Sequence, residues 1–358
     1  MTNIAARTEP VASMAKFKEN LLLNFKADLP RILPDNGISI GIPLVFEFWN
    51  SLPFWKALFT TLGFNVSVSG RSNAEMAEKG NRFAPSDSIC FPAKLMHGHI
   101  ETLITGKVDR IFAPAIKTMS CHKGNSTSIN MCPIIQGLPI LVSHLNRPPE
   151  RAGIPVDSPV FAWHSNKMRD SQIVNFFRTV YEIPAVSVKK ALKIADNARM
   201  QFNELLYEES SARLRMIEKS KGFGIMMLGR PYHSDSYINH KIPEIITDMG
   251  VPVLTSDTMK GPDKIDMSYI RPEAYNPFHT ELLGAAIFAA KHPQLEAVQL
   301  ASFGCGHDAI LCDEIQRLMG LFGSKRSLVL KIDDGECKGS LSIRIRSFIE
   351  TVRKKRSI

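Results

Sequence analysis

Apolar and polar positions follow the same order in two separate parts of this chain. Residues 38–43 form a short apolar run, residues 49–62 repeat apolar positions at helical spacing, and a second apolar run occupies 63–68. The same order returns later in the chain, at 223–228, 238–249 and 250–254. A glycine after the last apolar turn typically caps a helix, and short unbroken apolar runs are typical of buried parallel strands. The pattern predicts a strand, a helix and a strand in each part.

The two parts continue in parallel. In each, a further apolar run ends shortly before a cysteine, and a last strand follows. A predicted helix precedes that run in the first part and follows it in the second. The predicted segments are helix 94–105, strand 108–114 and strand 140–142 in the first part, and strand 295–303, helix 309–320 and strand 328–332 in the second. Alternating strands and helices imply parallel sheets with helices on both faces. The fold class is therefore predicted as α/β, with two Rossmann-like doubly wound parallel-sheet domains joined by a helical connector.

We expect the following domain division: an N-terminal helical segment (1–35), a first α/β cluster-binding domain (36–150), a helical connector (151–221) and a second α/β cluster-binding domain (222–358). Within the connector, one helix is predicted over 166–181 and one or two over 186–221, because Pro184 separates the two patterns. A last helix is predicted over 340–355.

Composition narrows the class of protein. With 358 residues, 44% hydrophobic and 22% charged, the chain reads as globular. No apolar run approaches the roughly 18 residues of a membrane span, and the first 18 residues lack the apolar core of a secretory signal. We therefore expect a cytoplasmic protein without a membrane partner. Residues 353–356 carry four of the nine net positive charges, and no nucleic-acid motif is visible, so no nucleic-acid partner is expected.

Cysteines in glycine- and proline-rich loops carry the strongest chemical signal. Cys305 lies between two glycines where a predicted strand meets a helix, Cys90 precedes Phe91 and Pro92, and Cys132 precedes Pro133. Cys121 follows the strand 108–114. Thiolates at such positions are typical ligands of an iron–sulfur cluster, whereas inert buried thiols are the alternative. The absence of any CxxC pair gives a zinc ribbon no support.

Other interpretations stay open at this point. Residues 304–309 formally match the G-x-G-x-x-A dinucleotide fingerprint. Arg230 and His233 follow a strand end, where they are candidates to bind an anionic substrate or to donate hydrogen bonds to a cluster sulfur. Lys94 is a candidate to offset thiolate charge near Cys90. Cys312, inside a helix, is expected in the core, and Cys337 is expected in a polar surface loop.

Six dispersed motifs resemble a known family. They are Gly41-Ile42-Pro43, Pro53-Phe54-Trp55, Cys90-Phe91-Pro92-Ala93-Lys94 with His97-Gly98-His99, Cys132-Pro133, Gly229-Arg230-Pro231-Tyr232-His233 and Ser302-Phe303-Gly304-Cys305-Gly306. In this order they resemble the uncharacterised region attached to CoA-enzyme activases, within the 2-hydroxyacyl-CoA dehydratase and double-cubane cluster protein superfamily. The likeness extends over about residues 36–350.

The resemblance implies an iron–sulfur protein, with either a [4Fe–4S] cluster or a double cubane, that accepts low-potential electrons from an ATP-dependent activase. It implies cluster ligation by Cys90, Cys132 and Cys305, with Cys121 as a further candidate, and catalysis resembling an acyl-CoA dehydratase or an iron–sulfur reductase. A non-catalytic partner-binding or assembly module with the same fold is the alternative.

The resemblance also bears on partners. The sequence has no P-loop, so another chain would have to supply the activase. A CoA thioester or another small molecule is the expected substrate. A double cubane would need more thiolates, from Cys312, Cys337 or a second subunit in a homo- or heterodimer.

Overall fold

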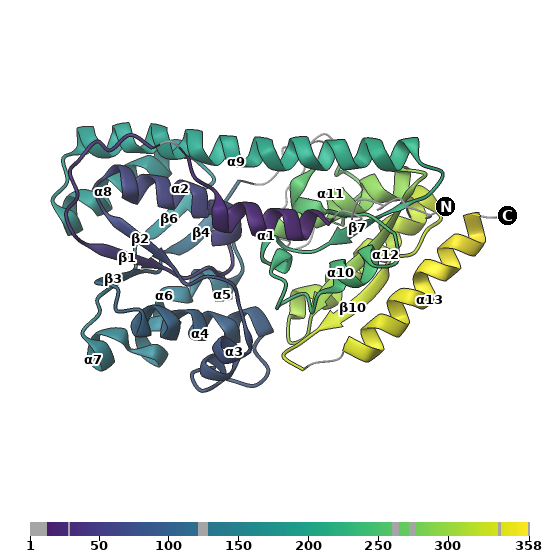
Figure 1. Ribbon diagram of the computed structural model, residues 1–358, viewed down its shortest axis with the longest axis horizontal. Coiled ribbons are helices and arrows are strands. Elements are labelled where there is room, and N and C mark those ends of the chain that lie inside the picture. Colours follow the sequence, from purple (N-terminus) through teal and green to yellow (C-terminus); the bar gives the residue numbers. More distant parts are fainter. Residues whose placement is uncertain are drawn as a thin grey trace, which may run out of the picture.

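The computed structural model describes residues 13–27, 29–120, 128–259, 265–271, 276–335 and 338–356. These residues form two α/β lobes side by side, spanned by one long helix (Figure 1). Cys121 and Cys337 lie outside the described residues.

The first lobe is built on a four-stranded parallel sheet in the order β2-β1-β3-β5. Its strands are β1 (Ser39–Ile42), β2 (Asn65–Val68), β3 (Arg110–Phe112) and β5 (Val156–Asp157). Beside it, β4 (Ala115–Met119) and β6 (Val160–Trp163) pair in parallel as a two-stranded sheet. The apolar run at 38–43 forms a strand because it is buried on both faces, as parallel strands are.

Helices cover both faces of the first lobe. Helix α2 (Phe48–Thr61) and helix α8 (Asn166–Tyr181) lie on one face, while α3 (Ala74–Asn81), α4 (Phe91–Thr105), α6 (Leu138–Leu141) and α7 (Pro148–Ala152) lie on the other (Figure 1). Helix α5 (Pro133–Gln136) lies on the side facing the second lobe. The core between α2 and the sheets is aromatic, with the Trp55 ring centroid 4.7 Å from Phe112 and 5.3 Å from Phe161.

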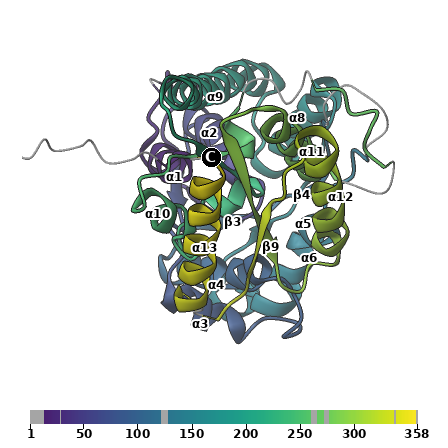
Figure 2. The ribbon, with the colours of Figure 1, turned by 90° about the vertical axis from the view of Figure 1, so that its right-hand side faces the viewer.

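The second lobe repeats the strand order of the first. Its parallel sheet runs β10-β9-β7-β8, from β7 (Gly224–Leu228), β8 (Val253–Thr255), β9 (Leu295–Ser302) and β10 (Leu328–Ile332). Viewed along the long axis, α10 (Ile242–Thr247) and α13 (Lys338–Arg356) cover one face of β9, and α11 (Pro277–Lys291) and α12 (Gly306–Gly323) cover the other (Figure 2). The α/β prediction with parallel sheets is confirmed in both lobes.

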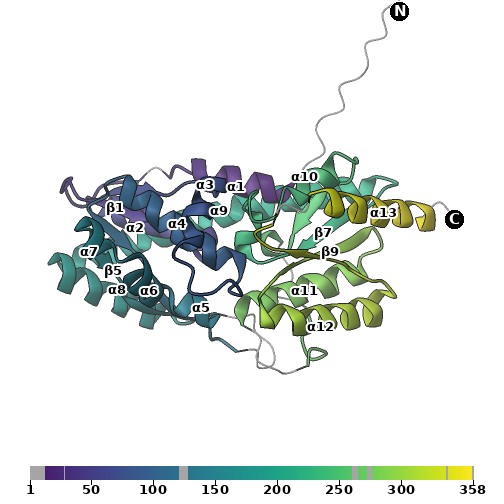
Figure 3. The same ribbon diagram turned by 90° about the horizontal axis from the view of Figure 1, so that it is seen from below.

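Two elements tie the lobes together. Helix α9 (Ala185–Lys219) is a single 35-residue helix, about 52 Å long at 1.5 Å per residue, that runs over both lobes. Helix α1 (Met14–Asn24) lies at the junction (Figure 3) and packs against both β8 and α2. At this junction Lys18 of α1 forms an ion pair with Asp257 of η3 (Ser256–Thr258).

Two sequence predictions are wrong. The segment 140–142 is not a strand but the end of α6 and the start of the π-helical turn η1 (Val142–Asn146), and β5 takes the fourth place in the sheet. Pro139 fits the first turn of a helix, where no backbone N–H is needed. The helix predicted over 238–249 is shorter, because α10 begins only at Ile242, with Pro243 in its first turn, and residues 236–241 form turns.

Candidate functional site

Three cysteines occupy the same structural position in three different elements. Cys90 is the N-cap of α4, Cys132 is the N-cap of α5, and Cys305 is the N-cap of α12. None of the three side chains caps its own helix by a hydrogen bond. The thiols are therefore available for another ligand. At the N-termini of the long helices α4 and α12, the aligned peptide dipoles favour negative charge on sulfur.

Gly304 joins the loops that carry Cys305 and Cys90. Its backbone has φ +78°, and a Cβ placed there would lie 2.3 Å from the Ser88 carbonyl oxygen of the first lobe. Only glycine permits both the left-handed conformation and this approach. The missing side chain thus lets the two loops meet at the junction of the lobes.

The three thiols are close enough to affect one another electrostatically. Burial raises the pKa of Cys90 to about 11, and the thiols of Cys305 and Cys132 contribute to the rise, while Arg230 opposes it. Burial also raises the pKa of Cys305, to which Cys132 adds, again against Arg230. Without a bound cation the thiols of Cys90 and Cys305 stay protonated at neutral pH. A metal group would favour the thiolates, as metal ligation couples to deprotonation.

Arg230 is the charged group at the centre of this site. Its guanidinium forms a bidentate pair with Asp308, with Nη1–Oδ2 and Nη2–Oδ1 distances of 3.0 and 2.5 Å. Nη2 also lies 3.4 Å from the Cys305 Sγ. Burial alone would raise the pKa of Asp308, but Arg230 outweighs burial and holds that pKa below its ordinary value. The pair places a donor against sulfur in a region from which water is largely excluded.

Two histidines orient the Arg230 side chain and its loop. His233 Nδ1 accepts the Arg230 backbone N–H at 3.2 Å, so its Nε2 carries the proton and donates to Ser302 Oγ at 3.3 Å. Burial, with help from Arg230, lowers the pKa of His233 to about 3, so the ring is neutral. His279 Nε2 accepts from Arg230 Nη2 at 3.0 Å. His233 is fully buried and therefore lies behind Arg230 rather than at the surface of the site.

A pocket of about 410 Å³ opens beside Cys305. The turn at Ser302 and Phe303, the Cys312 side chain and Lys331 line it. Phe303 is 61% exposed. Cys312 is half-buried and lines this pocket, so the expectation of a core position is wrong; its place on α12 lies about two turns beyond Cys305. The pocket gives a small molecule access to the Cys305 side of the site.

Several predicted site residues meet here, and others do not. Cys90, Cys132, Cys305 and Arg230 share one electrostatic environment. Lys94 instead pairs with Asp334 at 2.8 Å, so its charge is already balanced by a carboxylate. The predictions for Cys121 and Cys337 fall on residues outside the described part of the chain. Asp308 and His279 were not predicted as site residues, and the only hint in the sequence is their position in the first turn of a helix.

The donor set of the described residues does not fit a single metal ion. Within the described residues, no set of three or more His, Cys, Asp and Glu side chains is placed to hold a single metal ion. In a [4Fe–4S] cluster each thiolate binds a different iron, so the ligands stand further apart than those of one ion. The thiols of Cys90, Cys132 and Cys305 lie close enough to affect one another electrostatically, and thiolates are the donors that such a cluster takes.

The fold and the site define a two-lobed α/β protein with cysteine thiols gathered between parallel sheets. The family described as the CoA enzyme activase uncharacterised domain matches residues 39–259, and the chain belongs to this family. This confirms the family expectation. The matched region includes Cys90, Cys132 and Arg230 and ends before Cys305.

More distant comparisons add little. No curated protein sequence matches the chain significantly. Zn(II)-bound AdcA from Streptococcus pneumoniae is 8% identical at a TM-score of 0.22, covering 88% of this chain, which spans only 57% of that protein. The C-terminal domain of glucosamine-fructose-6-phosphate aminotransferase from Francisella tularensis is 10% identical at a TM-score of 0.22, covering 94% of this chain and 92% of that domain. At these values neither likeness carries an argument. None of the helices in the described ranges is long and apolar enough to cross a membrane.

Proposed function

We propose that this chain binds an iron–sulfur cluster through Cys90, Cys132 and Cys305 and accepts low-potential electrons from an ATP-dependent activase on another chain. One observation carries the proposal: three thiols at three helix N-caps share the environment of a single buried arginine. The family membership supports the same reading. When bound, the cluster would supply one-electron redox chemistry.

Each part of the site has a role in this proposal. The thiols hold the cluster, and Arg230 donates to the Cys305 sulfur, which favours the reduced, more negative state by offsetting charge. Asp308 fixes the guanidinium, because a bidentate pair sets the plane of an arginine. Cys121 remains the candidate for the fourth ligand. The pocket beside Cys305 would admit a small-molecule substrate, such as a CoA thioester, for a dehydratase-like or reductase reaction.

Anaerobic reconstitution tests the cluster. The unmodified chain should gain broad visible absorbance and about four irons with matching sulfide per chain for a single cubane. Replacing Cys305, Cys90 or Cys132 by alanine should remove most of the iron. Cys312→Ala is the matched control, because its thiol lines the same pocket from the body of α12, and it should keep the iron. An iron-free unmodified chain, or full iron in all three N-cap variants, would contradict the proposal.

The activase requirement needs a separate test. One electron moved through one volt corresponds to about 23 kcal/mol, so a potential a few hundred millivolts below that of an ordinary ferredoxin demands several kcal/mol from ATP hydrolysis. The purified chain alone should hydrolyse no ATP and stay oxidised with reduced ferredoxin. Adding an activase, ATP and the ferredoxin should bleach the visible absorbance. ATPase activity of the chain by itself would overturn this part of the proposal.

A further inference from the structure

A second cavity, of about 390 Å³, lies between the lobes and is separate from the thiol pocket. It is lined from the first lobe by Glu47 at the start of α2, from α9 by Arg199, and from the second lobe by Asp257 and Glu281. The volume is within the range of small-molecule sites, about 300–1,000 Å³. Among the described residues, the proposed cluster ligands Cys90, Cys132 and Cys305 do not line it.

Glu47 is the unusual residue of this cavity. It is 1% exposed, and neither carboxylate oxygen has a hydrogen-bond partner among the described residues. Buried polar groups are almost always hydrogen-bonded, because leaving one without a partner costs its desolvation. Both oxygens belong to a residue that lines the cavity, so a ligand there can supply the missing donors.

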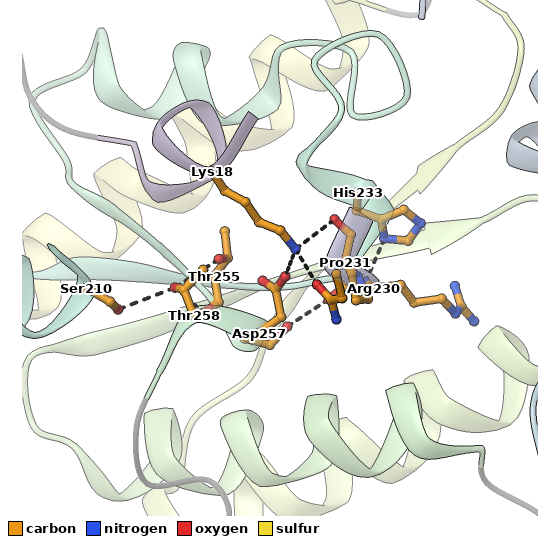
Figure 4. A network of polar contacts seen from close by, with 11 residues as sticks. Lys18, Ser210, Arg230, Pro231, His233, Thr255, Asp257 and Thr258 are labelled. Atoms are coloured by element: carbon orange, nitrogen blue, oxygen red, sulfur yellow. Dashed lines mark hydrogen bonds and ion pairs between the residues drawn. The ribbon is translucent and has the colours of Figure 1, made fainter. Parts of the chain in front are cut away.

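The nearby cations already have partners. Lys18 donates to Asp257, to Asn50 Oδ1 at 2.8 Å and to the Pro231 carbonyl at 3.5 Å, which uses its three N–H groups (Figure 4). In the same view the Arg230 side chain extends away from Lys18, toward the thiol site. Arg199 lies 3.5 Å from Asp196 and over the Trp163 ring. Glu47 and Glu281 therefore line the same cavity, and no cation among the described residues pairs with the Glu47 carboxylate.

We propose that this cavity binds a small molecule carrying a primary ammonium group, with Glu47 and Glu281 as its acceptors. An ammonium has three donors and a positive charge, which matches carboxylate oxygens that lack both. Two kinds of molecule present this group at a suitable size: an aliphatic diamine, and an amino acid whose carboxylate would meet Arg199. The proposal does not depend on the cluster, because none of the described residues that line this cavity is a thiol.

Protonation gives the proposal a measurable consequence. Burial raises the pKa of Glu47 to about 8. Burial, together with Asp257, also raises the pKa of Glu281, which Lys18 partly offsets. Arg199 and Tyr207 are the other titratable groups facing the cavity. An ammonium favours the ionised carboxylates, so binding near pH 7 should release protons, and affinity should rise as the pH approaches 8.

Calorimetric titration of the full chain tests this directly. The probes are 1,4-diaminobutane and L-lysine, and 1,4-butanediol is the neutral control of the same length. We expect at least one ammonium probe to bind, butanediol not to bind, and the heat to differ between buffers of unlike ionisation enthalpy because protons are released. The stronger probe identifies the source, since tighter binding of lysine would indicate that its carboxylate is also recognised.

A pair of variants sharpens the result. Glu47→Gln should weaken binding at least tenfold and reduce proton release. Glu244→Gln is the matched control, because Glu244 also has a raised pKa from burial and an unpartnered oxygen but lies on α10 outside the cavity; its binding should be unchanged. Failure of both ammonium probes to bind the unmodified chain, or equal affinity in Glu47→Gln, would overturn the proposal. Titrating cluster-loaded and cluster-free chain separates this outcome from failure of the proposed function.

Discussion

The first strand of each lobe leads to a buried charged residue, and the two residues are opposite in kind. In the first lobe β1 leads to Glu47, whose carboxylate has no partner among the described residues. In the second lobe β7 leads to Arg230, whose guanidinium is held by Asp308 and lies against Cys305. The strand order around them is the same. The same strand order therefore carries a buried ion pair, Arg230 with Asp308, in the second lobe. In the first lobe it carries a carboxylate, Glu47, without a hydrogen-bond partner among the described residues.

The lobes also divide the thiol site unequally. The first lobe contributes the thiols of Cys90 and Cys132, and the second contributes Cys305 together with the Arg230–Asp308 pair. Two of the three thiols therefore come from one lobe, and the charged pair beside Cys305 comes from the other. Such a site exists only when the lobes are held together, which gives α1, α9 and the Gly304 contact a functional meaning.

The largest loss of folding stability should come from removing the counter-ion of Arg230. Asp308→Asn leaves Arg230 buried without its counter-ion, and removing one partner of a buried pair costs about 3–5 kcal/mol. The first lobe offers a comparison, because Asp157 pairs with Arg110 in a similar bidentate way but Arg110 remains 27% exposed. We expect Asp157→Asn to cost less, since water can reach that guanidinium. Chemical denaturation of both variants measures the difference, and equal losses would contradict the distinction.

A smaller loss of folding stability should follow from separating the loops that carry Cys305 and Cys90. Gly304→Ala adds a Cβ that would lie 2.3 Å from the Ser88 carbonyl at a positive φ. The left-handed conformation alone costs about 1–2 kcal/mol for an L-residue, and the contact adds to this. We expect lower stability and a several-fold loss of reconstituted iron. Gly306→Ala is the control, because a Cβ there meets nothing within 4 Å, and it should retain both.

Much of the fold could be predicted because the buried parallel strands are short continuous apolar runs. Such runs predicted the strands at 38–43, 223–228 and 328–332. The helix at 166–181 was also predicted. The run at 140–142 failed for a general reason: a short apolar segment has no periodicity that separates a strand from a buried helix. Strands β4, β5 and β6 were missed; the predicted strand ended at residue 114, one position before β4 begins.

The site could be predicted only in part. Loop cysteines and Arg230 have local signals in the sequence, namely flanking glycine or proline and a strand end. The pairing of Arg230 with Asp308 spans 78 positions, and the unpartnered state of Glu47 depends on what other elements, such as α9, η3 and α11, place around it. Both are consequences of tertiary packing, for which a single sequence carries no signal.

The last prediction concerns folding stability against pH. The unpaired carboxylate of Glu47 should show a pH dependence opposite in sign to that of the paired carboxylate of Asp308. The folded-state pKa of Glu47, about 8, lies above its model-peptide value, so the folded chain binds this proton more tightly than the unfolded chain. The stabilisation that the folded chain gains from protonated Glu47 is fully present below about pH 4.3. It is lost as the pH rises to 8. Glutamine keeps the shape and cannot ionise, so Glu47→Gln should melt several degrees higher than the unmodified chain at pH 8. The two melting temperatures should converge toward pH 4.

Asp308, with a pKa below its ordinary value, should show the reverse, losing stability only in acid. Melting curves from pH 4 to 8 check both signs, and a Glu47→Gln variant less stable than the unmodified chain at pH 8 would show that this carboxylate has a partner after all.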